Sequence, residues 1–182
     1  NVPDIGDVEI TVELCREIGA EVQWDKKEKT IEIITKQLKT SKIDQRFSGA
    51  NRIPILMYHS IESVPKATVM RSLHVSPRKF RFQMWLLKIL GYKALSLKKL
   101  KPYIDGHKRG KVVGITFDDG YQNNLLNAAP ILTKYKFSAT CYIVSDNLGL
   151  TNTWDKDKGI TQKALMNEDE INQWLSFGMD IG

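Results

Sequence analysis

Short apolar runs alternate with longer amphipathic stretches from residue 53 onward, and this alternation limits the possible folds more than any other feature. Five runs have the length and composition of buried strands, at residues 53–58, 92–95, 111–117, 138–144 and 179–182. Helical stretches separate them, at residues 77–90, 97–105, 125–135 and 168–177. Ser76, Ser96 and Asn167 are the expected caps of three of these helices. The pattern predicts an α/β fold whose parallel strands carry functional residues at their carboxyl ends.

Composition is consistent with a chain that buries a core. The 182 residues are 42% hydrophobic and 26% charged, which excludes collagen-like and wholly disordered classes. The sequence contains no apolar run near the roughly 20 residues that a membrane-spanning helix needs, so we expect no membrane span. Its two cysteines, Cys15 and Cys141, make neither a disulfide framework nor a zinc ribbon. Cys141 lies within an apolar run and is interpreted as a buried thiol.

Charge is distributed unevenly along the chain. Residues 1–35 hold 4 basic and 9 acidic side chains, residues 36–111 hold 18 and 3, and residues 112–182 hold 5 and 9. A basic block of this size can attract an anionic polymer, although a solvated surface is the simpler interpretation. Aromatic residues do not alternate with the basic ones as a base-stacking surface requires, so we expect no nucleic-acid partner.

The N-terminal part has a different pattern. Residues 8–19 suit a short helix, and residues 21–24 and 30–35 suit two strands around a polar turn. The run GAEVQWD at 19–25, followed by KTIEI at 29–33, resembles the end of a copper amine oxidase N-terminal-like domain. We therefore assign residues 1–36 to a small α+β fragment of that kind and the polar residues 37–51 to a linker. The fragment has no His or paired Cys for a metal site.

The most informative local sequence is the strand at 112–117 followed by Asp118, Asp119 and Gly120. A strand that ends in two acids places both at its carboxyl edge, and the turn at Gly120 allows both side chains to approach one site. Two close carboxylates favour a bound cation, and one of them can then accept a proton from water. A solvated Asp-Asp-Gly turn explains the same residues equally well.

The surrounding residues resemble the polysaccharide deacetylase family, the carbohydrate esterases with a NodB-type domain. Besides TFDDGY at 116–121, the matching segments are ILMYH at 55–59, SP at 76–77, LGY at 90–92, APIL at 129–132 and AT at 139–140. Their order is that of the family's Met-Tyr-His branch, over residues 52–182. The resemblance implies an incomplete distorted (β/α) barrel of NodB type. It also implies that Asp118 is the general base and Asp119 a metal ligand.

His59 follows the first strand of this region. A lone His at the end of a strand is more often structural. In the branch that the chain resembles, however, the corresponding His stands in for the general acid, so the resemblance makes His59 a candidate catalytic residue. Tyr121 could either line a substrate groove or pack in the core. His74 and His107 lie in predicted loops, where we expect both to face solvent.

One family feature is missing. Members carry a His-(Ser or Thr)-x-x-His segment directly after a strand like 179–182, and its two His complete the metal site, but this sequence stops at Gly182. A catalytic zinc usually has three protein ligands, and the resemblance identifies only one of them here, Asp119. The divalent metal implied by the family, zinc by preference, therefore has an incomplete site. We expect the chain to be a fragment that is inactive or nearly so by itself.

Two functions remain as hypotheses. The first is metal-dependent deacetylation of N-acetylated polysaccharides of the cell envelope, with extracellular location implied by the family resemblance. The alternative is a non-catalytic protein whose basic surface holds an anionic cell-wall polymer. Hydrolysis that a chelator abolishes distinguishes the first, and binding that salt weakens distinguishes the second.

Overall fold

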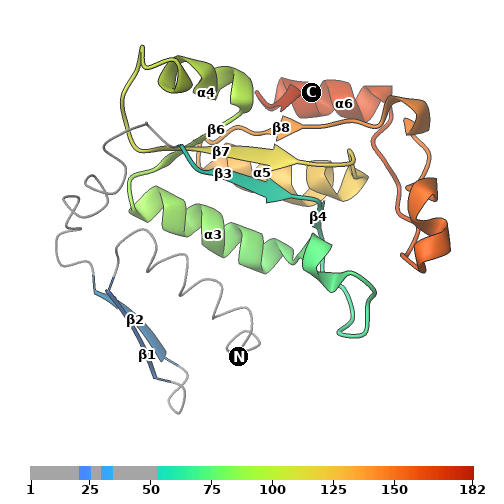
Figure 1. Ribbon diagram of the computed structural model, residues 1–182, viewed down its shortest axis with the longest axis horizontal. Coiled ribbons are helices and arrows are strands. Elements are labelled where there is room, and N and C mark those ends of the chain that lie inside the picture. Colours follow the sequence, from blue (N-terminus) through green and yellow to red (C-terminus); the bar gives the residue numbers. More distant parts are fainter. Residues whose placement is uncertain (1–20, 26–29, 35–52) are drawn as a thin grey trace. The chain divides into compact units, whose positions relative to one another are not determined.

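A computed structural model describes residues 21–25, 30–34 and 53–182 (Figure 1). The chain divides into two units, Asn1–Arg52 and Ile53–Gly182. In the first, β1 (Glu21–Asp25) pairs antiparallel with β2 (Thr30–Ile34), in a register that places Gln23 opposite Glu32. The two expected strands are thus confirmed, whereas the helix expected at residues 8–19 and the linker at 37–51 lie outside the described residues.

The second unit is built on a parallel sheet of five strands. They are β3 (Ile55–Tyr58), β6 (Lys93–Leu95), β7 (Val112–Phe117), β8 (Thr140–Cys141) and β9 (Asp180–Ile181). β7 is central, because it pairs with β3 on one side and with both β6 and β8 on the other. β9 continues the sheet beyond β8. The α/β class with a parallel sheet is confirmed, and the described strands form an open path from β3 to β9 without closing into a barrel.

Four helices connect these strands; three begin where the sequence predicts, and α5 begins four residues later. They are α3 (Pro77–Ile89), α4 (Leu97–Ile104), α5 (Ala129–Lys134) and α6 (Glu168–Ser176). The side chains of Ser76, Ser96 and Asn167 accept hydrogen bonds from backbone N–H groups in the first turns of α3, α4 and α6. At α6, Glu170 also returns a bond to the backbone of Asn167, which completes a capping box.

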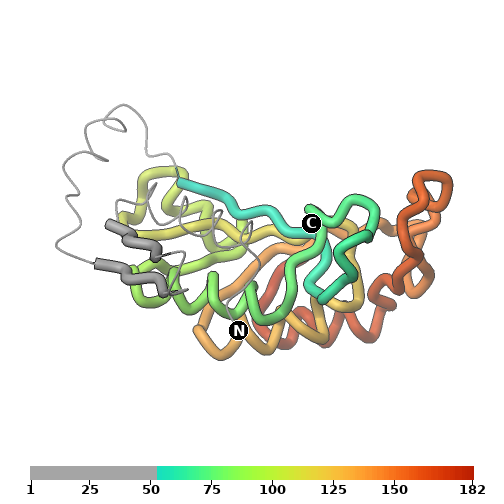
Figure 2. The backbone as a smooth tube through the Cα atoms, turned by 90° about the horizontal axis from the view of Figure 1, so that it is seen from below, coloured from blue at the N-terminus to red at the C-terminus, as the bar shows by residue number. Residues whose placement is uncertain are grey.

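One face of the sheet is packed against α3, α5 and α6 (Figure 2). Tyr58, Phe80, Phe117 and Trp174 form the centre of this core, and successive ring centroids lie 5.1–5.8 Å apart. Apart from Tyr58, which is 8% exposed, these rings are fully buried. Rings in contact at these distances add to the hydrophobic free energy of burying them. We call this side the packed face.

The opposite side of the sheet, which we call the open face, is much more accessible. Ile55 and Met57 of β3 point to this side and are 51% and 62% exposed. Near its amino end this face is covered by α4. A Cβ on Gly114 would stand 3.1 Å from side-chain atoms of both Ile55 and Leu100, so the close approach of α4 to β7 favours glycine there.

Several elements differ from the expectation. The strand expected at 138–144 is only Thr140–Cys141, and the helix expected at 125–135 begins with a π-helical turn, η2 (Asn124–Ala128). A short parallel pair, β4 (Ser60–Ile61) with β5 (His74–Val75), was not predicted, because two-residue strands have no detectable periodicity. No helix in the described ranges combines the length and the apolar character needed to cross a membrane.

Candidate active site

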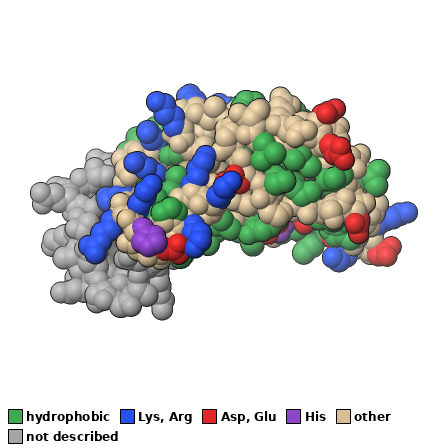
Figure 3. All heavy atoms as spheres, turned by 90° about the horizontal axis from the view of Figure 1, so that it is seen from above, with side chains coloured by type: hydrophobic (Ala, Val, Ile, Leu, Met, Phe, Trp, Pro, Cys, Tyr) green, Lys and Arg blue, Asp and Glu red, His purple; other side chains and the backbone are tan. Residues whose placement is uncertain are grey.

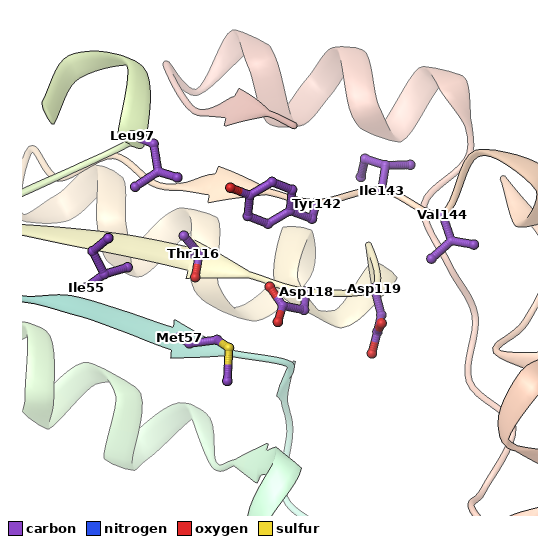
Figure 4. Close-up of a pocket in the computed structure, with 9 residues that line it drawn as sticks. All are labelled: Ile55, Met57, Leu97, Thr116, Asp118, Asp119, Tyr142, Ile143 and Val144. Atoms are coloured by element: carbon purple, nitrogen blue, oxygen red, sulfur yellow. The ribbon is translucent and has the colours of Figure 1, made fainter. Parts of the chain in front are cut away.

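The three candidate residues meet at the carboxyl edge of the sheet. His59 follows β3, and Asp118 and Asp119 follow β7, its parallel neighbour. Figure 4 shows both carboxylates beyond the end of β7. They line one pocket of about 700 Å³ that extends over the open face, and its other lining residues are Ile55, Met57, Leu97, Thr116, Tyr142, Ile143 and Val144. The expectation that both acids face a common cavity is therefore met.

His59 and Asp118 face each other across the ends of β3 and β7. His59 Nε2 lies 3.8 Å from Asp118 Oδ2, and the two side chains are 21% and 28% exposed. The backbone fixes this pairing, since the Asp118 N–H donates to the Tyr58 carbonyl at 2.9 Å and so extends the strand ladder by one bond. The imidazole and the carboxylate are thus close enough to act on one substrate, while both remain accessible to water.

The backbone after Asp118 explains how two consecutive acids reach one pocket. Asp119 has a φ of 71° and Gly120 a φ of 69°, both in the left-handed region. Asp tolerates this conformation better than most residues, and glycine adopts it without strain. The turn breaks the strand alternation that would otherwise direct Asp118 and Asp119 to opposite faces.

Asp119 lies in an environment that disfavours its charge. Burial raises its pKa, with smaller contributions in the same direction from Asp118 and Asp155, while His59 and a hydrogen bond from Tyr121 oppose the shift. A positive charge beside Asp119 would relieve this cost. The Tyr121 side chain is buried, so packing and the bond to Asp119 account for it rather than an exposed groove position.

Asp155 is a neighbour of the site that the sequence did not reveal. It belongs to the 3-10 turn η4 (Thr153–Lys158), is 7% exposed, and is held by Asn152 Nδ2 at 3.3 Å and Lys158 Nζ at 3.0 Å. The loop that contains it returns to the site through backbone bonds, from Met166 N–H to the Gly120 carbonyl and from Gln122 N–H to the Ala164 carbonyl. Because Asp155 lies 36 positions after Asp119, no local motif connects the two.

The expectation that His74 faces solvent is wrong. Its side chain is 4% exposed and lies in a polar cluster, 3.4 Å from Glu62 Oε1 and 3.3 Å from Lys163 Nζ. Lys163 also forms an ion pair with Glu62. Burial lowers the pKa of His74, and the positive charge of nearby His59 acts in the same direction. The β4–β5 pairing buries this residue, and that pairing has no sequence signature. His107 is exposed, as expected.

Cys141 lies directly behind the site on the packed face. It is fully buried and free, which confirms the prediction of an apolar thiol. Burial raises its pKa to about 12, opposed by a backbone hydrogen bond at Gly120. A thiol in this state is protonated at neutral pH and has no part in the chemistry of the pocket.

The described residues do not complete a metal centre. Within them, no three His, Cys, Asp or Glu side chains converge on a point where a metal ion could bind. Asp119 has the chemistry of one ligand, since it is a half-buried carboxylate whose pKa is raised by burial. A zinc site with three protein ligands therefore does not fit the residues at hand.

Comparison with known proteins begins with a family match. Residues 105–182 match the sequence model of the family described as Polysaccharide deacetylase. A Bacillus subtilis relative, "Putative polysaccharide deacetylase YxkH", is 34% identical over 132 residues, which is 71% of this chain and 41% of that protein. The Staphylococcus epidermidis poly-beta-1,6-N-acetyl-D-glucosamine N-deacetylase is 34% identical over 105 residues, 57% of this chain and 36% of that protein.

Solved structures agree with this match. The Streptococcus pyogenes deacetylase PplD in complex with acetate has a TM-score of 0.55 and 29% identity, over 71% of this chain and 54% of that one. A de-N-acetylase from Aggregatibacter actinomycetemcomitans has a TM-score of 0.60 and 21% identity, over 72% of this chain and 54% of that one, and shows likeness of fold.

A second set of relatives has a different name. The UDP-N-acetylglucosamine 1-carboxyvinyltransferase of Protochlamydia amoebophila is 70% identical over 57 residues, 31% of this chain and 12% of that protein. The Chlamydia muridarum protein of the same name is 41% identical over 176 residues, 94% of this chain and 35% of that protein. These matches disagree with the others. The deacetylase matches are supported by two independent findings, because the family model spans Asp118 and Asp119 and the solved deacetylases share the fold of this chain.

The chain spans between 12% and 41% of the length of these curated relatives. The family model covers the two acids, and the solved folds cover most of the unit that also carries His59. Residues 105–182 thus match the polysaccharide deacetylase family by sequence, and the chain shares the fold of solved deacetylases.

Proposed function

We propose that the protein containing this chain removes acetyl groups from N-acetylated polysaccharides by metal-assisted hydrolysis. The observation that carries the proposal is that His59 Nε2 lies 3.8 Å from Asp118 Oδ2, and that Asp118 lines the same pocket as Asp119. An acid–base pair next to a carboxylate suited to a cation is one arrangement that can hydrolyse an amide. The family match supports the same reaction class.

In this proposal the two residues have separate roles. Asp118 accepts a proton from the water whose oxygen attacks the acetyl carbonyl. His59, as the imidazolium, donates its proton to the sugar nitrogen when the carbon–nitrogen bond breaks, so that acetate and a free amine leave. The 3.8 Å separation exceeds a hydrogen bond, and catalytic contacts of this kind often tighten only when substrate is bound.

Asp119 is proposed to supply one ligand to a divalent cation, zinc by preference. The described residues do not provide a full ligand set for this cation. The raised pKa of Asp119 supports its part, since a cation would stabilise the carboxylate form that burial penalises. The proposal places the remaining ligands elsewhere in the full-length protein.

The substrate class and the location are part of the same proposal. The name of the Staphylococcus epidermidis relative specifies a polymer of N-acetyl-D-glucosamine, so acetylated glucosamine oligomers are the first substrates to test. In this proposal the protein acts at the cell envelope or outside the cell.

The test measures acetate release from N-acetylglucosamine oligomers by the full-length gene product, with and without a chelator. We expect release that the chelator abolishes, and Asp118→Asn should reduce it by about 100-fold or more, since general base catalysis commonly contributes 10²–10⁴-fold. Undiminished release from Asp118→Asn would refute the role of Asp118 as base.

A second candidate function rests on surface charge. Figure 3 shows one surface of the molecule, and Lys and Arg side chains gather at one end of it. Exposed cations on α4 and the loop after it include Lys98, Lys101, Lys108, Arg109 and Lys111, whereas Asp105 is the one acid among residues 93–111. Such a surface suits an anionic wall polymer. Wall binding that salt weakens and a chelator leaves unchanged, without acetate release, would favour this candidate over hydrolysis.

A further inference from the structure

Three asparagines in the turn after the acid pair reach back to the segment that contains His59. Asn124 Nδ2 donates to the His59 carbonyl at 2.7 Å, and Asn124 Oδ1 accepts from the Ile61 N–H at 3.2 Å. Asn123 Oδ1 accepts from the same N–H at 3.1 Å. Asn127 Nδ2 donates to the Ile61 carbonyl at 2.7 Å. Side-chain amides thus bind the main chain on both sides of Ser60.

These bonds replace those that the sheet no longer supplies. The β3–β7 ladder ends where the Asp118 N–H donates to the Tyr58 carbonyl. The chain then leaves β7, and β4 pairs with β5 instead. Asn124 and Ile61 are both fully buried, so water cannot satisfy the groups that leave the ladder. Asn124 uses its donor and its acceptor together, which fixes the orientation of the amide.

Asn124 also belongs to the element that carries the acids. It lies six positions after Asp118 and opens the π-helical turn η2, where the Ala129 N–H donates to the Asn124 carbonyl five residues back. Pro130 has no N–H, which favours this wider turn at the start of α5. The buried side chain of Asn124, which follows β7, therefore hydrogen-bonds the backbone of His59, which follows β3.

We propose that Asn124 is a positioning residue that sets the distance between His59 and Asp118 through the His59 carbonyl. The inference rests on the proposed function, in which His59 protonates the leaving amine. Asn124 does not line the pocket, so in this proposal it affects the reaction through the His59 backbone that it binds. A shift of about 1 Å in a catalytic group can cost on the order of 100-fold in rate, so loss of this bond has a measurable effect.

The test compares two substrates that differ in their need for an acid. Release of an amine from an N-acetylglucosamine oligomer requires a proton on nitrogen, whereas 4-nitrophenolate leaves an aryl acetate without one. In the full-length protein, Asn124→Ala should lower kcat for the oligomer about 10- to 100-fold with little change in KM, and should change aryl acetate hydrolysis less than about threefold. Asp118→Asn should lower both.

Two further variants keep the proposal falsifiable. Asn127→Ala removes one bond from the same turn without touching His59, and should cost similar thermal stability with no selective loss on the oligomer. In a His59→Gln background, Asn124→Ala should cause no additional loss, because a residue that acts through His59 has nothing left to position. Should Asn124→Ala fail to fold, Asn124→Asp keeps an acceptor for the Ile61 N–H but, as the carboxylate, has no donor for the His59 carbonyl, and it should show the same selective loss on the oligomer.

Equal losses on both substrates, or an additional loss in the His59→Gln background, would overturn the assignment of Asn124. A wild-type protein that hydrolyses neither substrate contradicts the proposed function instead, so the two failures are distinguishable.

Discussion

The packed face of the sheet and its carboxyl edge are held together by different forces. Beneath the sheet, aromatic and aliphatic side chains from α3, α5 and α6 meet β7 in a continuous apolar core. At the edge, the contacts are polar and join segments far apart in the sequence, such as His59 with Asp118 and His74 with Lys163. The core determines where the strands lie, and the edge determines where the reactive groups lie.

Consecutive residues show how sharp this division is. Tyr58 ends β3 with its ring stacked on Phe117 in the core, and His59, the next residue, faces Asp118 in the pocket. On β7 the corresponding pair is Phe117 and Asp118. Each strand thus ends with an anchor on the packed face followed by a functional group at the edge. Changes to the anchors should affect stability, and changes to the polar contacts should affect pH response or activity.

The largest expected effect on stability is the loss of an anchor. Phe117→Ala removes a fully buried ring that contacts Tyr58, Phe80 and Trp174. It should lower the free energy of unfolding by about 3–5 kcal/mol, measured by urea denaturation of the chain. The matched control is Met57→Ala on the neighbouring strand, which is 62% exposed on the open face and should change stability by less than about 0.5 kcal/mol. Similar losses for both would contradict the division between the faces.

A smaller effect is expected at the edge, where the stability should depend on pH through His74. Burial and the nearby His59 lower the pKa of His74 in the folded chain. The carboxylate of Glu62 acts in the opposite direction, and Lys163 is a further positive neighbour. The unfolded chain therefore binds a proton more readily, and the free energy of unfolding should decrease as pH falls below about 6.5, through the lowered pKa.

Denaturant titrations between pH 5 and 8 measure this dependence, and His74→Gln should reduce its slope. A slope unchanged by that substitution would show that His74 titrates normally in the folded chain. The packed face has no comparable group in the described residues, so Phe117→Ala should shift the whole pH profile downward without changing its shape.

Local features of the sequence were enough to predict most of the fold. The periodicity of α3 and the cap at Ser76 act within a few residues, as do the buried strand β7 and the two acids that follow it. His59 was identified as a candidate catalytic residue from family resemblance and not from the residues next to it, because its partner Asp118 lies 59 positions later in the chain.

The rest of the site depends on long-range contacts. The buried position of His74 depends on its contact with Lys163, 89 positions away. The π-helical turn at Asn124 is explained by the hydrogen bond between its side chain and Ile61. Tertiary packing decides such contacts, and neither periodicity nor composition encodes them. The pair Asn123-Asn124 after Asp-Asp-Gly-Tyr-Gln was a local sign of these contacts, since a buried side-chain amide such as that of Asn124 needs partners from elsewhere.

The smallest expected effect concerns Cys141, where the packed face comes closest to the edge. Its thiol has a pKa of about 12 and is fully buried, so both the thiolate fraction and access for a reagent are low. Iodoacetamide at pH 8 should leave the peptide containing Cys141 unmodified in the folded chain and should alkylate it fully in denaturant, as measured by mass spectrometry. Phe117→Ala should increase labelling only as far as it populates the unfolded chain, since the thiol is protected by the packing and not by the polar contacts of the pocket. Rapid labelling of the folded wild type would mean that the core opens beneath Gly120, and the sheet would then be too loose at this point to hold Asp118 and Asp119 in one pocket.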